Sequence, residues 1–411
     1  MDDGQAQAIG SRVRMARLRR GLTLKETAQG AGISAGFLSM VENGKRLLDS
    51  SRHIAALAEV LQTTPTELAG RHLPSADRMS ADAHAAVPAL RLALMGAGIW
   101  SQPPGPPPPE PVLAERVAEA NQRYHAAAYG ELAASLPDLL ADLHAATDAA
   151  SGSRRRRLLR LLIAAYSPAT VMLLKYLGYS DLAFIAVTRA ADLTAELDDP
   201  AYTALSGFFT AHVLLAAGSP TQALRHATDA ADTLATRLTT PAAHALLGEL
   251  HLIRATATTL DRTRSGKSRV VEVTDHLAEA TTLADRTGES RAWHLNFGPA
   301  NVGIHHVSLN TDLQQYGQAI NAGTGPHADL SPLPSGRQAA FHTDLGRALA
   351  HTRANEARAV AALLTAERLA PQRVRGNHLV AETLRRLARR RLPHRTRRDV
   401  QGLAHRIGIT P

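Results

Sequence analysis

The sequence predicts an all-α protein, in which a compact N-terminal domain of five short helices precedes an α-solenoid of stacked helical hairpins. The strong helix formers alanine, leucine and arginine dominate the composition, and aromatic residues make up only 4% of it. Helix start and stop signals recur through the first 70 residues. Beyond residue 112, short connectors alternate with alanine-rich stretches of helical length, which is the pattern of a helical repeat protein.

The first domain, residues 1–73, has start or stop signals at the boundaries of its predicted helices. Thr23 and Glu26 have the spacing of a capping box, and Ser34 is positioned to cap the helix that follows. Gly32 and Gly44 can adopt the left-handed conformation that closes a helix. The predicted helices span residues 7–20, 23–31, 34–43 and 51–61, and a short fifth helix opens at 64–67.

Residues 74–111 are predicted to connect the two domains. The pattern over 83–95 is compatible with one helix. The run Ser101–Pro111 contains too many prolines for helix or sheet, and it predicts an extended polyproline segment. We interpret this segment as a semi-rigid spacer; the alternative is a proline-motif ligand for another protein.

Residues 112–411 are predicted to form about seven helical pairs, each of which buries its face on its neighbour. Alanines four residues apart, such as Ala223, Ala227 and Ala231, let paired helices approach closely. The stretch Pro326–Ser335 is the longest break after the proline run and is expected to be a loop. The predicted connectors are residues 177–180, 217–220, 262–267, 310–311 and 351–355.

The formal net charge of +9 is unevenly distributed along the chain. Residues 1–70 contain nine basic and seven acidic residues, whereas residues 385–411 contain nine arginines and one aspartate. The C-terminal run and a shorter run at 154–157 could each bind a polyanion such as DNA. Such runs are more often solvated helix faces or partners of acidic patches, and we favour this second interpretation.

The composition favours the cytoplasm. The chain has no cysteine, which excludes disulfides and thiolate metal sites. The first thirty residues lack the apolar core of a signal peptide, and no run of eighteen apolar residues predicts a membrane span. We therefore expect a cytoplasmic protein with no membrane partner.

Two stretches of the first domain carry a specific motif. In Arg17–Ala28 the motif begins Arg-x-x-x-Gly-Leu-Thr, and in Ala31–Arg46 Ala-Gly-Ile leads into Leu-Ser-x-x-Glu-x-Gly-Lys-Arg. Over residues 9–70 the chain resembles the phage-repressor type, or XRE-like, helix-turn-helix family of bacterial regulators. The resemblance implies that the helix after Ser34 enters the major groove of a double-stranded DNA operator. It also implies a homodimer on two half-sites, because one module buries too little surface.

The same resemblance implies roles for individual residues. Arg17 and Glu42 are expected to form an ion pair that stabilises the fold and orients the recognition helix. Three of the expected DNA-contacting positions, Ala35, Gly36 and Met40, depart from the family because they offer no forked hydrogen bond to a base. Base reading is therefore expected to depend on Ser39, Asn43 and Arg46, together with DNA shape. The full set of expected DNA contacts is Lys25, Ser34, Ala35, Gly36, Ser39, Met40, Asn43, Lys45 and Arg46.

The stretches 169–179, 295–303 and 366–374 resemble the tetratricopeptide-like sensor arrays that are fused to such DNA-binding domains in high-GC bacteria. The resemblance implies that the array dimerises and binds a short signalling peptide or a small molecule on its concave face. Binding would then shift the pair of DNA-binding domains.

Polar and aromatic side chains are concentrated in one part of this alanine- and leucine-rich array. Asn301 and His305 are four residues apart and share a helix face, and an asparagine can pair with a peptide backbone as donor and acceptor. The alternative is that Asn301 forms hydrogen bonds with backbone groups near a Phe-Gly-Pro turn, and we slightly favour this structural role over a ligand site. The candidate ligand-binding residues are Trp293, His294, Asn296, Phe297, Asn301 and His305, and a second group with the helical spacing of core residues is Tyr166, Lys175, Tyr176 and Tyr179.

No motif predicts catalysis, a cofactor or a metal site. The nineteen histidines lack the spacing of metal ligands, and there is neither a phosphate-binding glycine loop nor a nucleophile elbow. The sequence therefore predicts a sequence-specific transcription regulator that is not an enzyme, and whose array dimerises and senses a signal. The alternative is a DNA-tethered scaffold whose array docks a protein partner.

Overall fold

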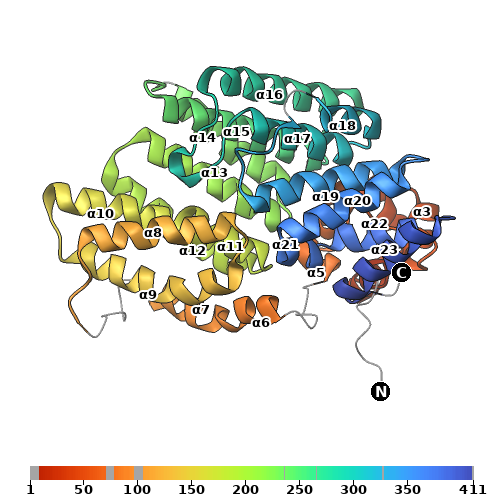
Figure 1. Cartoon of the computed structure of the whole chain (residues 1–411), viewed down its shortest axis with the longest axis horizontal. Coiled ribbons are helices and arrows are strands. Elements are labelled where there is room, and N and C mark those ends of the chain that lie inside the picture. The colour runs from red at the N-terminus through yellow and green to blue at the C-terminus, as the bar shows by residue number, and fades with distance from the viewer. Residues whose placement is uncertain are drawn as a thin grey trace.

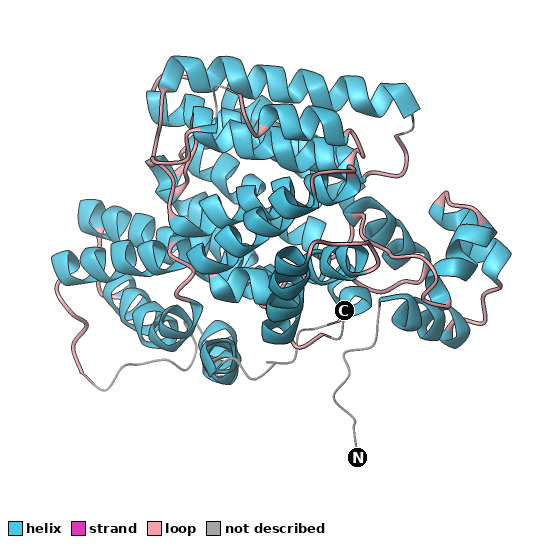
Figure 2. Ribbon diagram, turned by 45° about the vertical axis from the view of Figure 1, so that its right-hand side comes forward, coloured by secondary structure: helices cyan, strands magenta, loops and turns pink. Residues whose placement is uncertain are grey.

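The computed structural model describes residues 9–70, 78–96, 105–235, 237–264, 266–325 and 328–409. Within these ranges the regular secondary structure is helical, which confirms the predicted all-α class (Figure 2). The same ranges contain no strand, only an isolated antiparallel bridge between Ser290 and Phe297. Some predictions fall partly outside the described residues, namely the start of the first helix at residues 7–8, residues 101–104 of the proline run, and Pro326 in the last loop.

Five short helices form the N-terminal domain, as the capping signals predicted. Their apolar faces meet in a separate small core that includes Val13, Leu38, Leu57 and Leu68. The helices are α1 (Ile9–Arg19), α2 (Leu24–Ala31), α3 (Ala35–Glu42), α4 (Ser51–Val60) and α5 (Pro65–Ala69).

The segment between the domains contains two helices, α6 (Arg78–Ala85) and α7 (Val87–Gly96), where the sequence was compatible with one. Both pack against α9 (Tyr129–Asp148), and Leu90 and Leu94 belong to the main core of the array. Residues 105–109 of the proline run have no regular secondary structure, but Pro111 lies in the first turn of α8. Proline is compatible with this position because the first amides of a helix have no intrahelical partner.

The rest of the chain forms the predicted array. Consecutive helices pack as seven pairs within the described residues: α8 with α9, α11 with α12, α13 with α14, α15 with α16, α17 with α18, α19 with α20, and α22 with α23 (Figure 1). The first half of the array comprises α8 (Glu110–His125), α9, α10 (Gly152–Ala164), a π-helical turn η1 (Ala165–Thr170), α11 (Val171–Tyr176), α12 (Ser180–Leu197), α13 (Pro200–Ala216) and α14 (Pro220–Ala235). The second half comprises α15 (Pro241–Leu260), α16 (Gly266–Thr287), a 3₁₀ turn η2 (Ala292–His294), α17 (Pro299–Asp312), α18 (Tyr316–Ala322), α19 (Ser335–His351), α20 (Glu356–Leu369), α21 (Pro371–Arg375), α22 (His378–Ala388) and α23 (His394–Ile407).

Most helix boundaries in the array follow the predicted connectors, with one exception. The sequence placed a connector at residues 310–311, but α17 continues to Asp312 and the turn occupies residues 313–315. Asn310 therefore does not stop the helix: its side-chain amide donates to the carbonyl of His306 inside α17. The predicted loop before Ser335 is observed between α18 and α19.

One stretch, Gly152–Tyr176, is long and apolar enough to pass as a membrane-crossing helix by composition. It contains α10, η1 and α11, and 72% of its most apolar window is buried inside the protein. This degree of burial is what the core helices of a helical array show.

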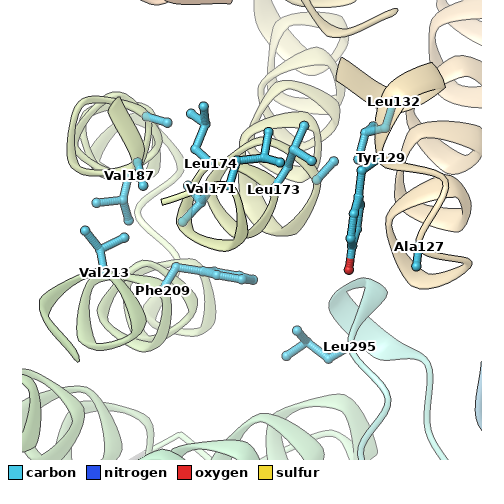
Figure 3. Close-up of a cluster of buried hydrophobic side chains, with 14 of the residues drawn as sticks. Ala127, Tyr129, Leu132, Val171, Leu173, Leu174, Val187, Phe209, Val213 and Leu295 are labelled. Carbon is cyan, nitrogen blue, oxygen red and sulfur yellow. The ribbon is translucent and has the colours of Figure 1, made fainter. Parts of the chain in front are cut away.

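The main core lies between the helices of the array. Side chains from the start of α9 and from α11, α12 and α13 converge there, and Leu295 approaches from the loop after η2 (Figure 3). Tyr129, Phe209 and Leu173 are completely or almost completely buried. Burial of aliphatic side chains contributes about 25 cal/mol per Å² of apolar surface, so this core is the main source of the array's stability.

The N-terminal domain is docked onto the C-terminal part of the array. Leu379 of α22 joins the small N-terminal core. Asp49, in the loop before α4, accepts hydrogen bonds from Arg386 and lies 3.2 Å from His351. Arg262, in the loop after α15, pairs with Glu59 of α4 at 3.1 Å. The domain is therefore held by charged contacts at several points.

Candidate functional site

The two helices α2 and α3 meet across a tight turn whose geometry is determined locally. The Thr23 hydroxyl accepts a hydrogen bond from the Glu26 amide, and the Glu26 carboxylate accepts one from the Thr23 amide, which completes the capping box at the start of α2. Gly32 ends α2 with φ at +67°, a conformation that costs an L-residue energy. The Ser34 hydroxyl then caps α3 by accepting from the Phe37 amide at 3.1 Å. This is the geometry of a helix-turn-helix.

The face of α3 that carries the expected DNA contacts is open to solvent. Ala35, Gly36 and Met40 are exposed, and outside the chain neighbours of Gly36 and the backbone of its own helix no atom lies within 4 Å of where a Cβ on Gly36 would be. The small side chains at the start of α3 therefore let its backbone approach a partner closely. Ser34 and Asn43 are also exposed, Ser39 is half-buried, and Lys25, Lys45 and Arg46 are exposed cations around the helix.

Two of these side chains are held by local contacts. Asn43 donates through its amide nitrogen to the Ser39 carbonyl at 2.8 Å, which fixes the orientation of the amide at the end of α3. The Arg46 guanidinium lies 4.9 Å from the centre of the Phe37 ring, within cation–π range. Both groups are therefore positioned before any partner arrives.

A buried ion pair joins α1 to α3. Arg17 donates to both carboxylate oxygens of Glu42, each at 2.7 Å, and also to the Leu22 carbonyl at 2.9 Å. Arg17 and Glu42 are 8% and 7% exposed, so solvent screens the pair weakly. The hydrogen bond from Arg17 to Glu42 raises the pKa of Arg17. The pair holds α3 against α1.

Two of the candidate ligand-binding residues, Trp293 and His294, line a pocket of about 280 Å³. Both adopt the left-handed backbone region, with φ at +60° and +54°, which is strained for residues other than glycine. The buried hydroxyl of Ser167 also lines the pocket and has no hydrogen-bond partner among the described residues. The polar and aromatic lining residues are Arg160, Ser167, Tyr202, Arg291, Trp293 and His294.

Asn296 does not enter this pocket. Its side-chain amide lies 3.1 Å from Nδ1 of His125, whose Nε2 lies 2.7 Å from the His294 carbonyl. These partners fit a neutral His125 that donates from Nε2 and accepts at Nδ1. Burial is the largest cause that lowers the pKa of His125 to about 4. Asn296 therefore ties the η2 loop to the end of α8.

Asn301 and His305 instead join a polar cluster with residues that the sequence did not single out. Arg337, in the first turn of α19, donates to Oδ1 of Asn301 and lies 3.4 Å from Nε2 of His305. The amide nitrogen of Asn301 donates to Glu249 of α15 at 3.1 Å. The hydrogen bonds of the Asn301 side chain thus go to other side chains rather than to the backbone of the Phe-Gly-Pro turn.

Protonation in this cluster is determined mainly by burial. Burial raises the pKa of Glu249 to about 7, although Arg337 and Asn301 oppose the shift. Burial, followed by the charge of Arg337, lowers the pKa of His305 to about 3, so this imidazole is neutral at physiological pH. Glu249 is consequently only partly ionised near neutral pH and compensates Arg337 incompletely.

Three cations from distant parts of the chain lie close together here, and we call Lys175, Arg337 and Arg373 the cationic cluster. Burial, and then the charges of Arg373 and Arg337, lower the pKa of Lys175 to about 8. The Lys175 ammonium lies 3.0 Å from Nδ1 of His212, which is neutral because burial holds its pKa well below the usual value. None of the three cations forms an ion pair with a carboxylate among the described residues. The cluster therefore carries positive charge that Glu249, which is linked to Arg337 through Asn301, compensates only in part.

Sequence reasoning missed most of this cluster because its members are far apart in the chain. The helical spacing of Lys175 and three tyrosines predicts core packing, and this is confirmed for the tyrosines: Tyr166 is buried in the main core, and Tyr176 and Tyr179 pack against it. Lys175 instead places its ammonium beside His212. One signal was available: lysine occurs at only four positions, and Lys175 is the only one inside a predicted array helix with apolar neighbours. No local pattern marks Arg337 or Arg373.

Comparison with known proteins characterises the N-terminal domain. Residues 8–73 match a family model described as a helix-turn-helix domain. A comparison with curated protein sequences found no match. Among solved structures, the chain is similar to Bacillus thuringiensis PlcR in complex with the peptide PapR7 and DNA. The identity is 16%, 68% of this chain and 95% of that chain are covered, and the TM-score is 0.32, which is too low to support a functional argument. On the family match and the geometry of α1–α5, the N-terminal region of this chain is a helix-turn-helix domain.

Proposed function

We propose that this chain is a cytoplasmic DNA-binding transcription regulator of the XRE-like type, which acts as a homodimer and responds to a peptide or small-molecule signal. The observation that carries the proposal is the solvent-exposed recognition helix α3, held in a helix-turn-helix domain by the buried Arg17–Glu42 pair. The helix N-terminus at Ser34 favours a phosphate, and Lys25, Lys45 and Arg46 supply positive charge around it. No catalytic step and no cofactor form part of this proposal.

The exposed side chains of α3 indicate how sequence would be read. Ser39, Asn43 and Arg46 can hydrogen-bond to base edges or phosphates, whereas Ala35 and Met40 can contact only apolar groups such as the thymine methyl. Direct base reading by one domain is therefore limited. A second copy on a second half-site and sequence-dependent DNA shape would supply the remaining specificity.

DNA binding is testable by fluorescence anisotropy of the full chain with the DNA upstream of its own gene, with random DNA as competitor. We expect a preference of about 10³-fold or more over random DNA. The double variant Lys45→Ala/Arg46→Ala should weaken binding strongly, whereas the matched control Lys267→Ala/Arg286→Ala removes the same charge from exposed positions on α16 and should not. If the wild-type chain does not bind DNA even at low salt, the proposal is wrong.

We infer that the signal is anionic, because no carboxylate of the described residues forms an ion pair with the cationic cluster and Glu249 compensates it only in part. Arg337 and Arg373 keep their charge at any physiological pH, and their mutual repulsion with Lys175 would be relieved by a ligand carboxylate or phosphate. The pocket at Trp293 and His294 is lined by none of these three cations and is a separate feature. A short peptide with a free C-terminal carboxylate would supply the anion.

The helix α19 offers a physical route from this cluster to the DNA-binding domain. Arg337 lies at its start, and Arg347, ten residues further on, contacts Asp312 at 2.8 Å and the Asp49 carbonyl at 3.5 Å. At a rise of 1.5 Å per residue the two arginines are roughly 15 Å apart along one rigid element. A ligand that displaced Arg337 would therefore move α19 and, through Arg347, the N-terminal domain. In a dimer, a small movement of this domain would change the distance between the two DNA-binding helices.

The sensing proposal is tested with a library of short peptides, each with a free and with an amidated C-terminus, using calorimetry on the full chain. We expect the free carboxylate to be required and Lys175→Met, which keeps the apolar stem but removes the charge, to weaken binding about tenfold, or about 1.4 kcal/mol. The bound peptide should also change operator affinity. Equal binding of amidated peptides, or binding without an effect on DNA, contradicts this part of the proposal.

Exposed apolar side chains on α7 and α12 support self-association. Leu92 and Met95 of α7 are 70% and 52% exposed, and Phe184 of α12, which packs on α7, is 52% exposed. The same surface is also the observation that favours the second candidate function, a DNA-tethered scaffold that docks a protein partner. Sedimentation of wild type and of Leu92→Glu separates the two: a dimer that the variant dissociates supports the regulator, and a monomer in both supports the scaffold.

A further inference from the structure

The arginines at the C-terminal end of the array fall into two groups. Those that face the protein are paired with carboxylates, for example Arg390 with Glu356 at 2.8 Å and Arg406 with Glu367 at 2.6 Å. Arg389, Arg391, Arg395, Arg397 and Arg398 are exposed, and none of these five forms an ion pair among the described residues. We call these five residues the arginine rim.

The internal run at residues 154–157 behaves differently, although its composition is similar. Arg155 pairs with Glu196 at 2.8 Å, Arg157 pairs with Glu110 at 2.6 Å, and Arg156 donates to the Leu197 carbonyl. That run is used mainly to hold neighbouring helices together. The arginines of the rim are thus exposed and have no carboxylate partner among the described residues, whereas Arg155 and Arg157 in the internal run form ion pairs.

The arginine rim adjoins the loop that follows the recognition helix. Arg389 donates to the carbonyl of Gly44 at 3.0 Å, and the next two residues are the exposed cations Lys45 and Arg46. Arg386, one turn earlier, fixes the same hairpin to Asp49. Accordingly, α3, α22 and α23 lie at the same end of the molecule (Figure 1).

We propose that the arginine rim extends the DNA-contacting surface of the helix-turn-helix domain and binds the phosphate backbone beside the site read by α3. This inference rests on the proposed DNA-binding function. The rim begins at Arg389, which contacts the loop that carries Lys45 and Arg46. Backbone phosphates recur every 3.4 Å of helix axis on each strand, so a duplex would present several phosphates along this end of the molecule. The docked array thereby contributes directly to affinity rather than acting only as a sensor.

Charge and chemistry favour DNA over an acidic protein as the occupant. The exposed side chains of α3 include Ala35, Gly36 and Met40, which cannot hydrogen-bond to a base, so the affinity of a complex would depend on backbone contacts. Arginine forks match phosphate geometry, and each contact releases condensed counterions from the duplex. Because Arg389 contacts the loop that carries Lys45 and Arg46, a duplex bound by α3 would lie beside this end of the rim. The added contacts strengthen operator and random DNA equally, because the backbone is the same in both.

The experiment compares the salt dependence of DNA binding in four forms of the full chain. The first two forms are the wild type and a rim variant, Arg391→Ala/Arg395→Ala/Arg398→Ala. The third form has lysine at the same three positions and so keeps the charge. The fourth is a remote control, Arg225→Ala/Arg237→Ala/Arg286→Ala. The control removes the same charge from exposed, unpaired positions on and near α14 and α16. All substitutions are on the surface, where effects on folding are small.

The rim variant should lower the slope of log K against log salt by about two to three, because each lost phosphate contact contributes about 0.9. The lysine form and the remote control should keep the slope within one unit of wild type. If the rim and control variants behave alike, the inference is wrong and the rim serves another partner. If the wild type itself does not bind DNA, the proposed function fails instead, so the two failures are distinguishable.

Discussion

At the scale of single residues, the buried ion pair between Arg17 and Glu42 joins α3 to α1. Glu42→Ala leaves the Arg17 guanidinium buried without its carboxylate. We expect a loss of about 3 kcal/mol in the local stability of the N-terminal domain, because an uncompensated buried charge remains. Hydrogen exchange of the α1 and α3 amides in the full chain measures it. The exposed pair Arg123–Glu119 is the control, and Glu119→Ala should cost less than about 1 kcal/mol.

Asp49 is one of the residues that join the N-terminal domain to the hairpin of α22 and α23. Burial acts to raise its pKa, but hydrogen bonds and charges from His351 and Arg386 outweigh this and lower it to about 2. A carboxylate whose pKa is lowered on folding stabilises above its unfolded value near 4, and this contribution is lost as pH falls from there towards 2.

Asp49→Asn tests this contribution. We expect the substitution to cost about 2 kcal/mol at pH 7, from the size of the pKa shift. The loss should appear as faster hydrogen exchange in α4, next to the interface. A difference between variant and wild type that stays constant down to pH 2 would contradict this role for the carboxylate.

At the scale of secondary-structure elements, α19 is fixed by charges near its C-terminal end. Arg347 bonds to Asp312 of α17 at 2.8 Å and to Asp344 at 2.7 Å, and its side chain is 5% exposed. Burial already raises the pKa of Asp312 in spite of Arg347. Arg347→Ala would leave both carboxylates without their cation.

For Arg347→Ala we expect a loss of roughly 3 kcal/mol or more at pH 7. The direction of the pH dependence follows from Asp312. Its pKa in the folded protein is raised above the unfolded value, so ionised Asp312 lowers the free energy of unfolding. This loss of stability becomes smaller as pH falls and Asp312 is protonated. The gap in unfolding free energy between variant and wild type should therefore narrow between pH 7 and pH 4. Arg368→Ala, an exposed arginine on α20, is the control and should change little.

The packing of α15 against the loop between η2 and α17 depends on a glycine. A Cβ on Gly248 would lie 1.9 Å from the Phe297 ring, which therefore has to move if the residue becomes alanine. We expect Gly248→Ala to cost about 1–3 kcal/mol through overpacking and to displace the loop that carries His294 and Asn296. Gly317→Ala on α18 has open space and should be neutral or slightly stabilising. Thermal unfolding of the two variants decides between these outcomes.

At the scale of the whole molecule, buried histidines should govern stability in mild acid. Burial is the largest cause that lowers the pKa of His53, His125 and His251 to about 4 and of His276 and His305 to about 3. The unfolded chain binds protons on these groups at higher pH than the folded chain, so stability falls as pH drops from about 6.5 to about 4. Glu249, with a pKa raised to about 7, acts in the opposite direction.

We therefore expect a net loss of stability between pH 6.5 and pH 4, because five histidines outweigh one glutamate. The melting temperature measured across this range at constant ionic strength checks the sign. His125→Gln should reduce the dependence, since the amide can replace the hydrogen bond to the His294 carbonyl without titrating. A melting temperature that rises on acidification would contradict the assignment.

The sequence by itself determined the helices and the helix-turn-helix, because their signals are local. Each signal acts within four residues of the chain, as in the Thr23–Glu26 capping box, the Ser34 cap and Gly32. The contacts form between residues that are close in the sequence, so the sequence spacing alone is enough to predict them. Only the tertiary structure decided which charges meet. Arg337 contacts Asn301, whereas Arg386 contacts Asp49 in the N-terminal domain. No pattern in the sequence of the second half distinguishes these two arginines. Whether a cation is compensated depends on which helices pack beside it, and that is a property of the folded array.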